Sequence, residues 1–374
     1  MIQTASLTLL SLLCSAVLAL SGLGSPLAVA HLAFAVGIVP LIFAAVMHFV
    51  PVLTRSAEPD RRLASLPSVV QVTGLVAVTA MQGWLPYSAV YVAAALDLLF
   101  SAVLLNWVAL RARAALGTPH PGWRWYGTAL GCLMLALSAI LLIAVWPSYG
   151  RALRIFHLHL NTLGLVGLAA LGTLPVLLPT ALGQADPEAG GWLRRRLWLV
   201  ASGALMVATG AAIAWPFAAP GTALILVAAL GLLGQWGRRF GIWPLIRDGV
   251  TASLLAAVIG LLLTLVAGLL HGAGIVSARP SLLAWASGFL LPLVSGALSQ
   301  LLPVWRWPGP QTPERLLMRR KLASSGAVRA GLFLSSALSL LAGMDVLGAA
   351  LLAIGLALFA IAVLQAVRVS RSTR

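Results

Sequence analysis

Long runs of apolar residues recur along the whole chain, and short polar breaks separate them. Each run has roughly 18 to 25 residues, the length that an α-helix needs to cross a hydrocarbon core about 30 Å thick. The alternating pattern of transmembrane strands, about ten residues long, does not occur. The pattern therefore predicts an all-α, polytopic membrane protein. Charges, prolines and glycine-rich breaks place about twelve spans at residues 3–24, 27–53, 68–85, 87–110, 125–146, 153–181, 197–217, 221–237, 249–271, 281–304, 325–343 and 346–367.

Composition supports this prediction and excludes a soluble enzyme. Hydrophobic residues make up 61% of the chain and charged residues 9%, a balance that would leave a soluble domain with large exposed apolar patches. Cys14 and Cys132 lie inside apolar runs, where packed free thiols are expected rather than a disulfide. The first run has no basic segment before it, so we expect it to be a retained span rather than a signal peptide.

The positions of the basic residues explain the positive charge of the chain. The net charge is +16, but the basic residues form short clusters between apolar runs rather than a basic arm, so no nucleic-acid partner is expected. All of the 24 Lys and Arg residues fall in alternate loops except Arg151, Arg154 and Arg279. Because cytoplasmic loops hold the excess of these residues, the pattern predicts a multi-pass protein of the bacterial inner membrane with both termini in the cytoplasm.

Proline and glycine positions indicate an internal repeat. The spacing of Pro40 and Pro51 matches that of Pro292 and Pro303, and Leu41 and Ala45 fall on Leu293 and Ala297. Pro179 takes the same place in span six. We therefore predict one membrane domain, residues 1–374, built from three parallel four-helix repeats. The predicted repeats cover about residues 1–110, 125–237 and 249–367.

Four of the six histidines fall at one predicted level, near the outer membrane face: His31, His157, His159 and His271. A neutral imidazole binds copper or heme iron well, so these four residues are candidate metal ligands. His157 and His159 point about 200° apart on a helix and would serve different sites, or one would support the other. Asn161 is one helical turn after His157 and is placed to hydrogen-bond it. The open alternative is that these are interfacial histidines without a cofactor.

The predicted architecture resembles the catalytic subunit of heme-copper oxidases and nitric-oxide reductases. The segment HLHLNTLGLVGLAALGTLPVLLPT also resembles bacterial NnrS-like membrane proteins. The resemblance implies that His31 is an axial heme ligand and that His157 or His159 binds copper. The ligand set is incomplete, since the equivalent stretch of span ten, SLLAWASGF, has no histidine and none lies between His159 and His271. Reduction of dioxygen or nitric oxide is therefore not expected, and whether the chain is an enzyme stays open.

Asp97 is the carboxylate nearest the middle of a predicted span, which makes it a candidate proton relay. The alternative is a neutral acid that is hydrogen-bonded to a neighbouring helix. The function predicted from these features is heme and/or copper binding near the outer face, in respiratory or nitric-oxide-related metabolism. Two alternatives remain: a multi-pass transporter, or a cofactor-free assembly partner of respiratory-chain components.

Overall fold

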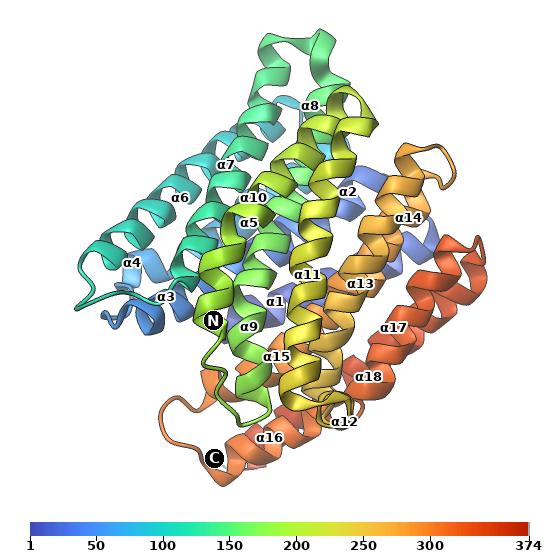
Figure 1. Ribbon diagram of the computed structural model, residues 1–374. Coiled ribbons are helices and arrows are strands. Elements are labelled where there is room, and N and C mark those ends of the chain that lie inside the picture. Colours follow the sequence, from blue (N-terminus) through green and yellow to red (C-terminus); the bar gives the residue numbers. More distant parts are fainter. Residues whose placement is uncertain (373–374) are drawn as a thin grey trace. The chain divides into compact units, whose positions relative to one another are not determined.

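The apolar runs form helices in the computed structural model, which describes residues 1–372 (Figure 1). A helix pairs its backbone N–H and C=O groups within one segment, as a chain surrounded by hydrocarbon requires. No strand occurs in these residues. The predicted all-α class is therefore confirmed.

Within the described residues, twelve helices are long and apolar enough to cross a membrane, and each matches one predicted span. Their bounds are Ile2–Ser21, Pro26–Thr54, Arg61–Met81, Ser88–Arg113, Gly122–Val145, Pro147–Ala181, Ala189–Ile213, Trp215–Phe240, Gly249–Gly272, Ala278–Arg306, Pro313–Leu341 and Asp345–Arg368. Large apolar side chains such as Leu99, Val227 and Ile354 are exposed on them, as expected for helices that face lipid. The chain has the architecture of a polytopic membrane protein.

Several helix boundaries differ from the prediction. The seventh span, for example, begins at Ala189 rather than at residue 197. The sixth span begins at Pro147 rather than at residue 153, so Arg151 lies inside a helix rather than before it. The predicted loop after span ten contains a separate helix, α16 (Pro313–Ala323), whose first turn is capped when the Thr312 hydroxyl accepts a hydrogen bond from the Arg315 amide at 3.3 Å. These segments are rich in arginine, which favours helix formation but lowers the hydropathy used to place spans.

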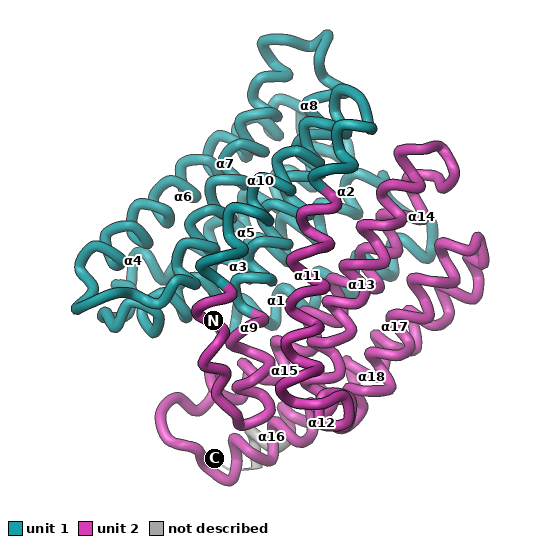
Figure 2. Tube along the Cα trace, viewed as in Figure 1, with its two compact units in different colours: residues 1–173, 193–221 teal, residues 174–192, 222–374 magenta. Residues whose placement is uncertain are grey.

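The chain divides into two compact units (Figure 2). Unit 1 comprises residues 1–173 and 193–221, and unit 2 comprises residues 174–192 and 222–374. The boundaries fall inside three helices of the middle of the chain rather than between the predicted repeats. The single domain with three repeats stays a prediction.

Unit 1 carries the N-terminal helices and the three predicted ligands His31, His157 and His159. Its elements are α1 (Ile2–Ser21), α2 (Pro26–His31), η1 (Leu32–Ile38), α3 (Val39–Thr54), α4 (Arg61–Ala64), α5 (Leu66–Met81), α6 (Ser88–Arg113), α7 (Gly122–Val145), η2 (Pro147–Tyr149), α8 (Gly150–His159), η3 (Leu160–Gly167), the start of α9 (Leu168–Ala181), most of α10 (Ala189–Ile213), η4 (Trp215–Phe217) and the start of α11 (Ala218–Phe240).

Unit 2 carries the C-terminal helices. Besides the remaining parts of α9, α10 and α11, its elements are α12 (Ile242–Arg247), α13 (Gly249–Gly272), α14 (Ala278–Trp285), η5 (Ala286–Leu290), α15 (Leu291–Arg306), α16, α17 (Gly326–Leu341) and α18 (Asp345–Ser372). The alternation of basic residues also places Arg374 on the cytoplasmic side, and this residue lies outside the described residues.

Three of the helical stretches contain a π-helical segment: η1, η3 and η5. They occupy similar places in the register that equates Pro51, Pro179 and Pro303. A π-helical turn breaks the regular ladder of backbone bonds and often marks a functional position. His31 and His159 each immediately precede one of these segments.

Side chains from neighbouring helices bond to the carbonyls of η1. The Thr8 hydroxyl on α1 donates to the Gly37 carbonyl at 2.8 Å, and the Gln71 amide on α5 donates to the Val36 carbonyl at 3.3 Å. Gly74 lets α5 pack directly on the same segment, because a Cβ there would stand 2.6 Å from the Ala35 carbonyl oxygen. The irregular backbone after His31 is thus held by packing and hydrogen bonds from two helices.

Candidate functional site

His31 and His157 come together in unit 1, from the end of α2 and from α8. Their ring centres lie 6.4 Å apart and their ring planes are inclined by 10°. Both residues are half-buried. Of the four predicted metal ligands, these two form a close pair.

A backbone carbonyl next to each ring determines which ring nitrogen carries the proton. Nδ1 of His31 lies 2.8 Å from the Leu27 carbonyl oxygen, and Nδ1 of His157 lies 2.9 Å from that of Ala136 on α7. A carbonyl accepts hydrogen bonds, so each Nδ1 carries the proton and each Nε2 carries the lone pair. This arrangement is typical of metal-binding histidines, whose second nitrogen is oriented by a carbonyl or carboxylate.

The start of α2 is also anchored. The Ser25 amide donates to the Gln82 side-chain oxygen at 2.7 Å, and the Ser25 hydroxyl donates to the Met81 carbonyl at 3.0 Å. The same hydroxyl accepts from the Ala28 amide at 3.2 Å, which caps the helix. These bonds hold the short helix that carries His31 against the end of α5.

The predicted contact between Asn161 and His157 is confirmed. The Asn161 side-chain nitrogen donates to the His157 carbonyl at 2.9 Å and lies 3.3 Å from Nε2 of the ring. Asn161 therefore contacts His157 on the same helix face, one turn after the histidine.

The other two predicted ligands have different surroundings. Nδ1 of His159 lies 2.9 Å from the Ile155 carbonyl oxygen of its own helix, whereas His157 bonds to the neighbouring helix α7. The two side chains thus have different partners, as their spacing predicted. His271 is exposed at the end of α13 in unit 2, where its Nδ1 lies 2.9 Å from the Val276 carbonyl oxygen. Their roles as metal ligands stay predictions.

In the part of the chain that the structure describes, no three His, Cys, Asp or Glu side chains are close enough to hold a metal ion together. The His31–His157 pair therefore offers two ligands. Copper sites built from protein side chains ordinarily use three or more. A cofactor that supplies further donor atoms fits a two-histidine site better.

Asp97 has a side-chain partner on the neighbouring helix. The Thr73 hydroxyl of α5 is hydrogen-bonded to Oδ1 of Asp97 on α6, and the Ser101 hydroxyl donates to the Asp97 backbone carbonyl at 2.6 Å. Thr73 is buried and Asp97 is half-buried. The predicted hydrogen bond to a neighbouring helix is present, while a proton-relay role stays a prediction.

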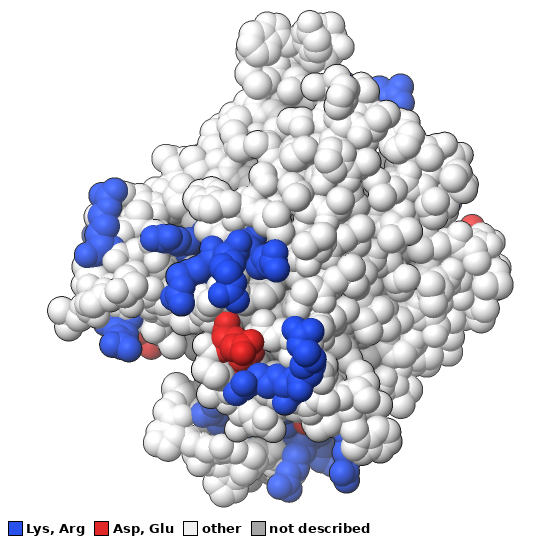
Figure 3. Space-filling view, viewed as in Figure 1, with Lys and Arg blue, Asp and Glu red and all other residues white. Residues whose placement is uncertain are grey.

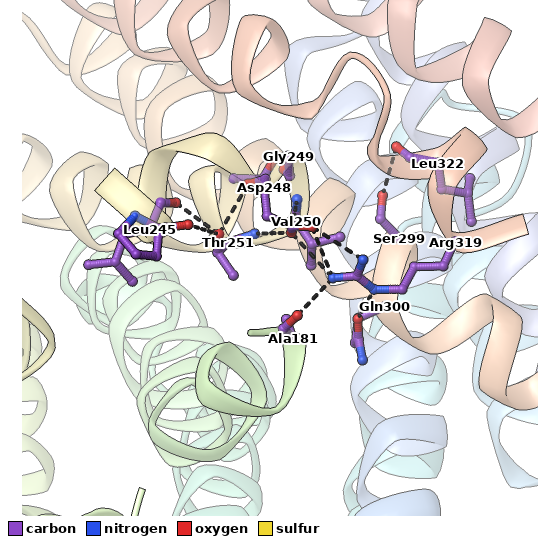
Figure 4. Close-up of polar contacts among 12 residues, drawn as sticks. Ala181, Leu245, Asp248, Gly249, Val250, Thr251, Ser299, Gln300, Arg319 and Leu322 are labelled. Carbon is purple, nitrogen blue, oxygen red and sulfur yellow. Dashed lines mark hydrogen bonds and ion pairs between the residues drawn. The ribbon is translucent and has the colours of Figure 1, made fainter. Parts of the chain in front are cut away.

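Sequence reasoning missed a polar cluster in unit 2 (Figure 4). Both Nη atoms of Arg319 on α16 donate to the Asp248 carboxylate at 3.2 Å, Nε donates to the Gln300 side-chain oxygen at 2.9 Å, and Nη2 donates to the Ala181 carbonyl at 2.8 Å. Asp248 also caps α13 by accepting from the Val250 amide at 3.0 Å. The cluster joins four segments. The one feature of the sequence that pointed to it is Asp248, an acidic residue directly before a predicted span.

Arg329 is a second residue that sequence reasoning misplaced. The charge pattern groups it with the cytoplasmic cations although it falls inside the predicted span 325–343. In the structure it is fully buried in α17, with a relative exposure of 0%. Its Nη1 donates to the Leu322 carbonyl and the Ser325 hydroxyl, each at 3.2 Å, and its guanidinium lies 4.7 Å from the ring centre of Phe359. The cation bonds to the end of α16 and holds the joint between α16 and α17.

Charged side chains are otherwise sparse. On the face shown in Figure 3 most of the surface is uncharged, and Lys and Arg side chains gather in a few clusters. Within the described residues the ion pairs are Arg239 with Asp186, at 3.4 Å, and Arg319 with Asp248, at 3.2 Å, both in unit 2. The Asp186 carboxylate also accepts a hydrogen bond from the Gln235 side chain at 2.9 Å.

Comparison of the chain with protein-family models, with curated proteins and with solved structures finds no match. The resemblance to heme-copper oxidases and NnrS-like proteins therefore stays a prediction from sequence features.

Proposed function

We propose that this chain is a membrane protein that binds a metal cofactor, heme or copper, between His31 and His157. The observation that carries the proposal is the geometry of the ring pair. An imidazole nitrogen binds a metal ion at about 2 Å and its ring centre lies about 1 Å further back, so two imidazoles on opposite sides of one ion have centres about 6 Å apart. The observed centre-to-centre distance of 6.4 Å is close to this value.

Heme suits the pair better than a copper ion alone. Porphyrin supplies four nitrogens to its iron, so two histidines complete the coordination, whereas a copper ion would need donors that the described side chains do not place there. Heme held in this way supplies one-electron transfer. His31 and His157 would together hold the group, and two protein ligands on the iron would favour electron transfer over binding of dioxygen or nitric oxide. This supports an electron-transfer or sensing role in respiratory or nitric-oxide-related metabolism, with respiratory-chain components as partners.

The proposed location is the bacterial inner membrane, with both termini in the cytoplasm. The alternation of basic loops supports it, because the excess of Lys and Arg stays on the cytoplasmic side. In this orientation α2 begins and α7 ends at the outer face, so His31 and His157 lie near that face. The cofactor would then be close to electron donors or acceptors outside the cytoplasm.

The test is an absorption spectrum of the purified protein, oxidised and then reduced with dithionite, with iron and copper quantified on the same sample. We expect a heme Soret band and about one iron per chain. His31→Ala and His157→Ala should each abolish or shift the band, because each removes one of the two residues that would hold the group. His159→Ala is the matched control: it removes an imidazole two residues from His157 that has a different partner, and should leave the spectrum unchanged.

A colourless protein that is free of iron and copper, purified from cells supplied with both, would contradict the proposal. It would favour the second candidate, a multi-pass transporter, which is supported by the π-helical breaks in three spans and by the intramembrane Asp97. A cofactor-free protein that co-purifies with a respiratory complex would instead favour the assembly-partner alternative.

A further inference from the structure

Asp97 lies near the middle of α6, far from either end of that helix. Its side chain is half-buried, so part of the carboxyl faces α5 and part is accessible from outside the unit. The adjacent Leu96 is an exposed apolar residue, 39% accessible, of the kind that faces lipid. In a membrane-spanning helix this position is in the hydrocarbon region, beyond the reach of bulk water.

The surroundings of Asp97 provide no charge to balance an ionised carboxylate. No titratable residue lies on α5. The titratable or charged side chains on the other elements that pack against α6 are His48 on α3 and Arg124, Tyr126 and Cys132 on α7. None of these described residues is hydrogen-bonded or ion-paired to Asp97, and the hydroxyl of Tyr126 pairs with Thr173 at 2.7 Å. An isolated carboxylate in hydrocarbon costs several kcal/mol, so the neutral acid is the stable form.

The same hydrogen-bond partners can also satisfy a neutral acid. The Thr73 hydroxyl has one proton, and two oxygens lie within its reach: Oδ1 of Asp97 and the Val70 carbonyl oxygen, the latter at 2.9 Å. If the acid keeps its proton, the carboxyl donates to the Thr73 oxygen while the Thr73 hydroxyl donates to Val70. All three groups are then satisfied without any charge.

We propose that Asp97 and Thr73 form a proton-binding site inside the membrane, with the carboxyl carrying its proton at neutral pH and open to apolar reagents in the lipid. The ligand is a proton, and Thr73 is a positioning residue that accepts the acid's hydrogen bond. The site is separate from the His31–His157 pair and does not depend on whether a cofactor is bound there.

Reaction with dicyclohexylcarbodiimide tests the site in the full-length protein, reconstituted in lipid vesicles. A protonated carboxyl transfers its proton to one carbodiimide nitrogen while its oxygen bonds to the central carbon, and the adduct rearranges to a stable N-acylurea with no leaving group. We expect mass spectrometry to find this adduct on the peptide that contains Asp97 at neutral pH. The yield should fall at strongly alkaline pH, as the acid loses its proton.

Variants of this region distinguish labelling of the Asp97 carboxyl from non-specific labelling. Asp97→Asn should lose the adduct, while Ser101→Ala should keep it, because the Ser101 hydroxyl contacts the backbone of Asp97 and not its carboxyl. Thr73→Ser retains the hydroxyl and should also label like the wild type. Absence of an adduct on Asp97 at every pH tested, in wild-type protein that is folded, would overturn the proposal.

Infrared spectroscopy gives a second measurement that needs no reagent. A neutral carboxyl in an apolar site has a C=O stretch distinct from that of a carboxylate. We expect this band at neutral pH in the wild type and its loss in Asp97→Asn. If Asp97→Asn fails to fold, the band of the wild-type protein after deuterium exchange still decides the question, because a neutral acid shifts on exchange and a carboxylate has no such band. A wild-type protein without the band would overturn the proposal.

Discussion

His120, in the loop between α6 and α7, shows how a single residue links stability to pH. Burial lowers its pKa from the ordinary value of 6.5, and the nearby positive charge of Arg194 lowers it further. Nδ1 accepts a hydrogen bond from the Gly122 amide at 3.3 Å, which the neutral ring allows and the protonated ring does not. The folded protein therefore resists protonation at this position more than the unfolded chain does.

This linkage predicts a loss of stability in mild acid. As pH falls below about 6.5, the unfolded chain binds a proton that the folded protein excludes, so the free energy of unfolding decreases. Above that pH the contribution of His120 is fully present. His120→Asn keeps an acceptor for the Gly122 amide but does not titrate, so the melting temperature should depend less on pH. Arg194→Gln should raise the pKa of His120 and also reduce the acid sensitivity. Equal pH profiles for wild type and His120→Asn would contradict the explanation.

At the scale of elements, close packing at small residues decides which helices meet. In unit 2, α13 packs against the π-helical segment η5 where Gly260 faces Gly288. A Cβ on Gly260 would stand 1.7 Å from the Gly288 carbonyl oxygen, which is backbone and cannot move aside alone. The absence of a side chain at this position is therefore required for the approach of α13 to η5.

Two glycines of the same helix allow a matched test. Gly260→Ala should lower the free energy of unfolding by about 1 to 3 kcal/mol, because α13 and η5 must separate. Gly268→Ala places its Cβ in open space, with no atom within 4 Å, and should be neutral or stabilising by up to about 1 kcal/mol through helix propensity. Thermal or denaturant unfolding in detergent measures both. A Gly260→Ala protein as stable as Gly268→Ala would show that the two elements are not in such close contact.

At the scale of the whole molecule, the alternation of basic loops predicts the membrane orientation. In a background with Cys14→Ser and Cys132→Ala, single cysteines replace Ala57, in the loop after α3, and Ser277, in the loop after α13. Both positions are exposed. A thiol reagent that cannot cross membranes, added to intact cells, should label Ser277→Cys and leave Ala57→Cys unlabelled until the cells are opened. The reverse pattern would place the histidine pair at the cytoplasmic face.

The sequence alone determined the all-α class, the number of apolar helices and nearly all of their positions. These properties are local, because each helix satisfies its own backbone and the length of an apolar run decides whether it can cross a membrane. Boundaries were missed where arginines continue a helix beyond its apolar part, as at Arg151 and in α16. Local spacing also predicted correctly that Asn161 contacts His157.

Tertiary structure decided which side chains meet. The sequence predicted that His31, His157, His159 and His271 lie at one level near the outer face. Packing then brought the rings of His31 and His157 into a nearly parallel pair. In the same way, packing paired Asp97 with Thr73, and it buried Arg329 although the charge pattern groups that residue with the loop cations. These contacts depend on how each helix is rotated and which helix lies beside it. Interlocking side chains and close contacts at glycines determine the rotation of each helix and the identity of its neighbour. The residues of a single span do not determine these two properties.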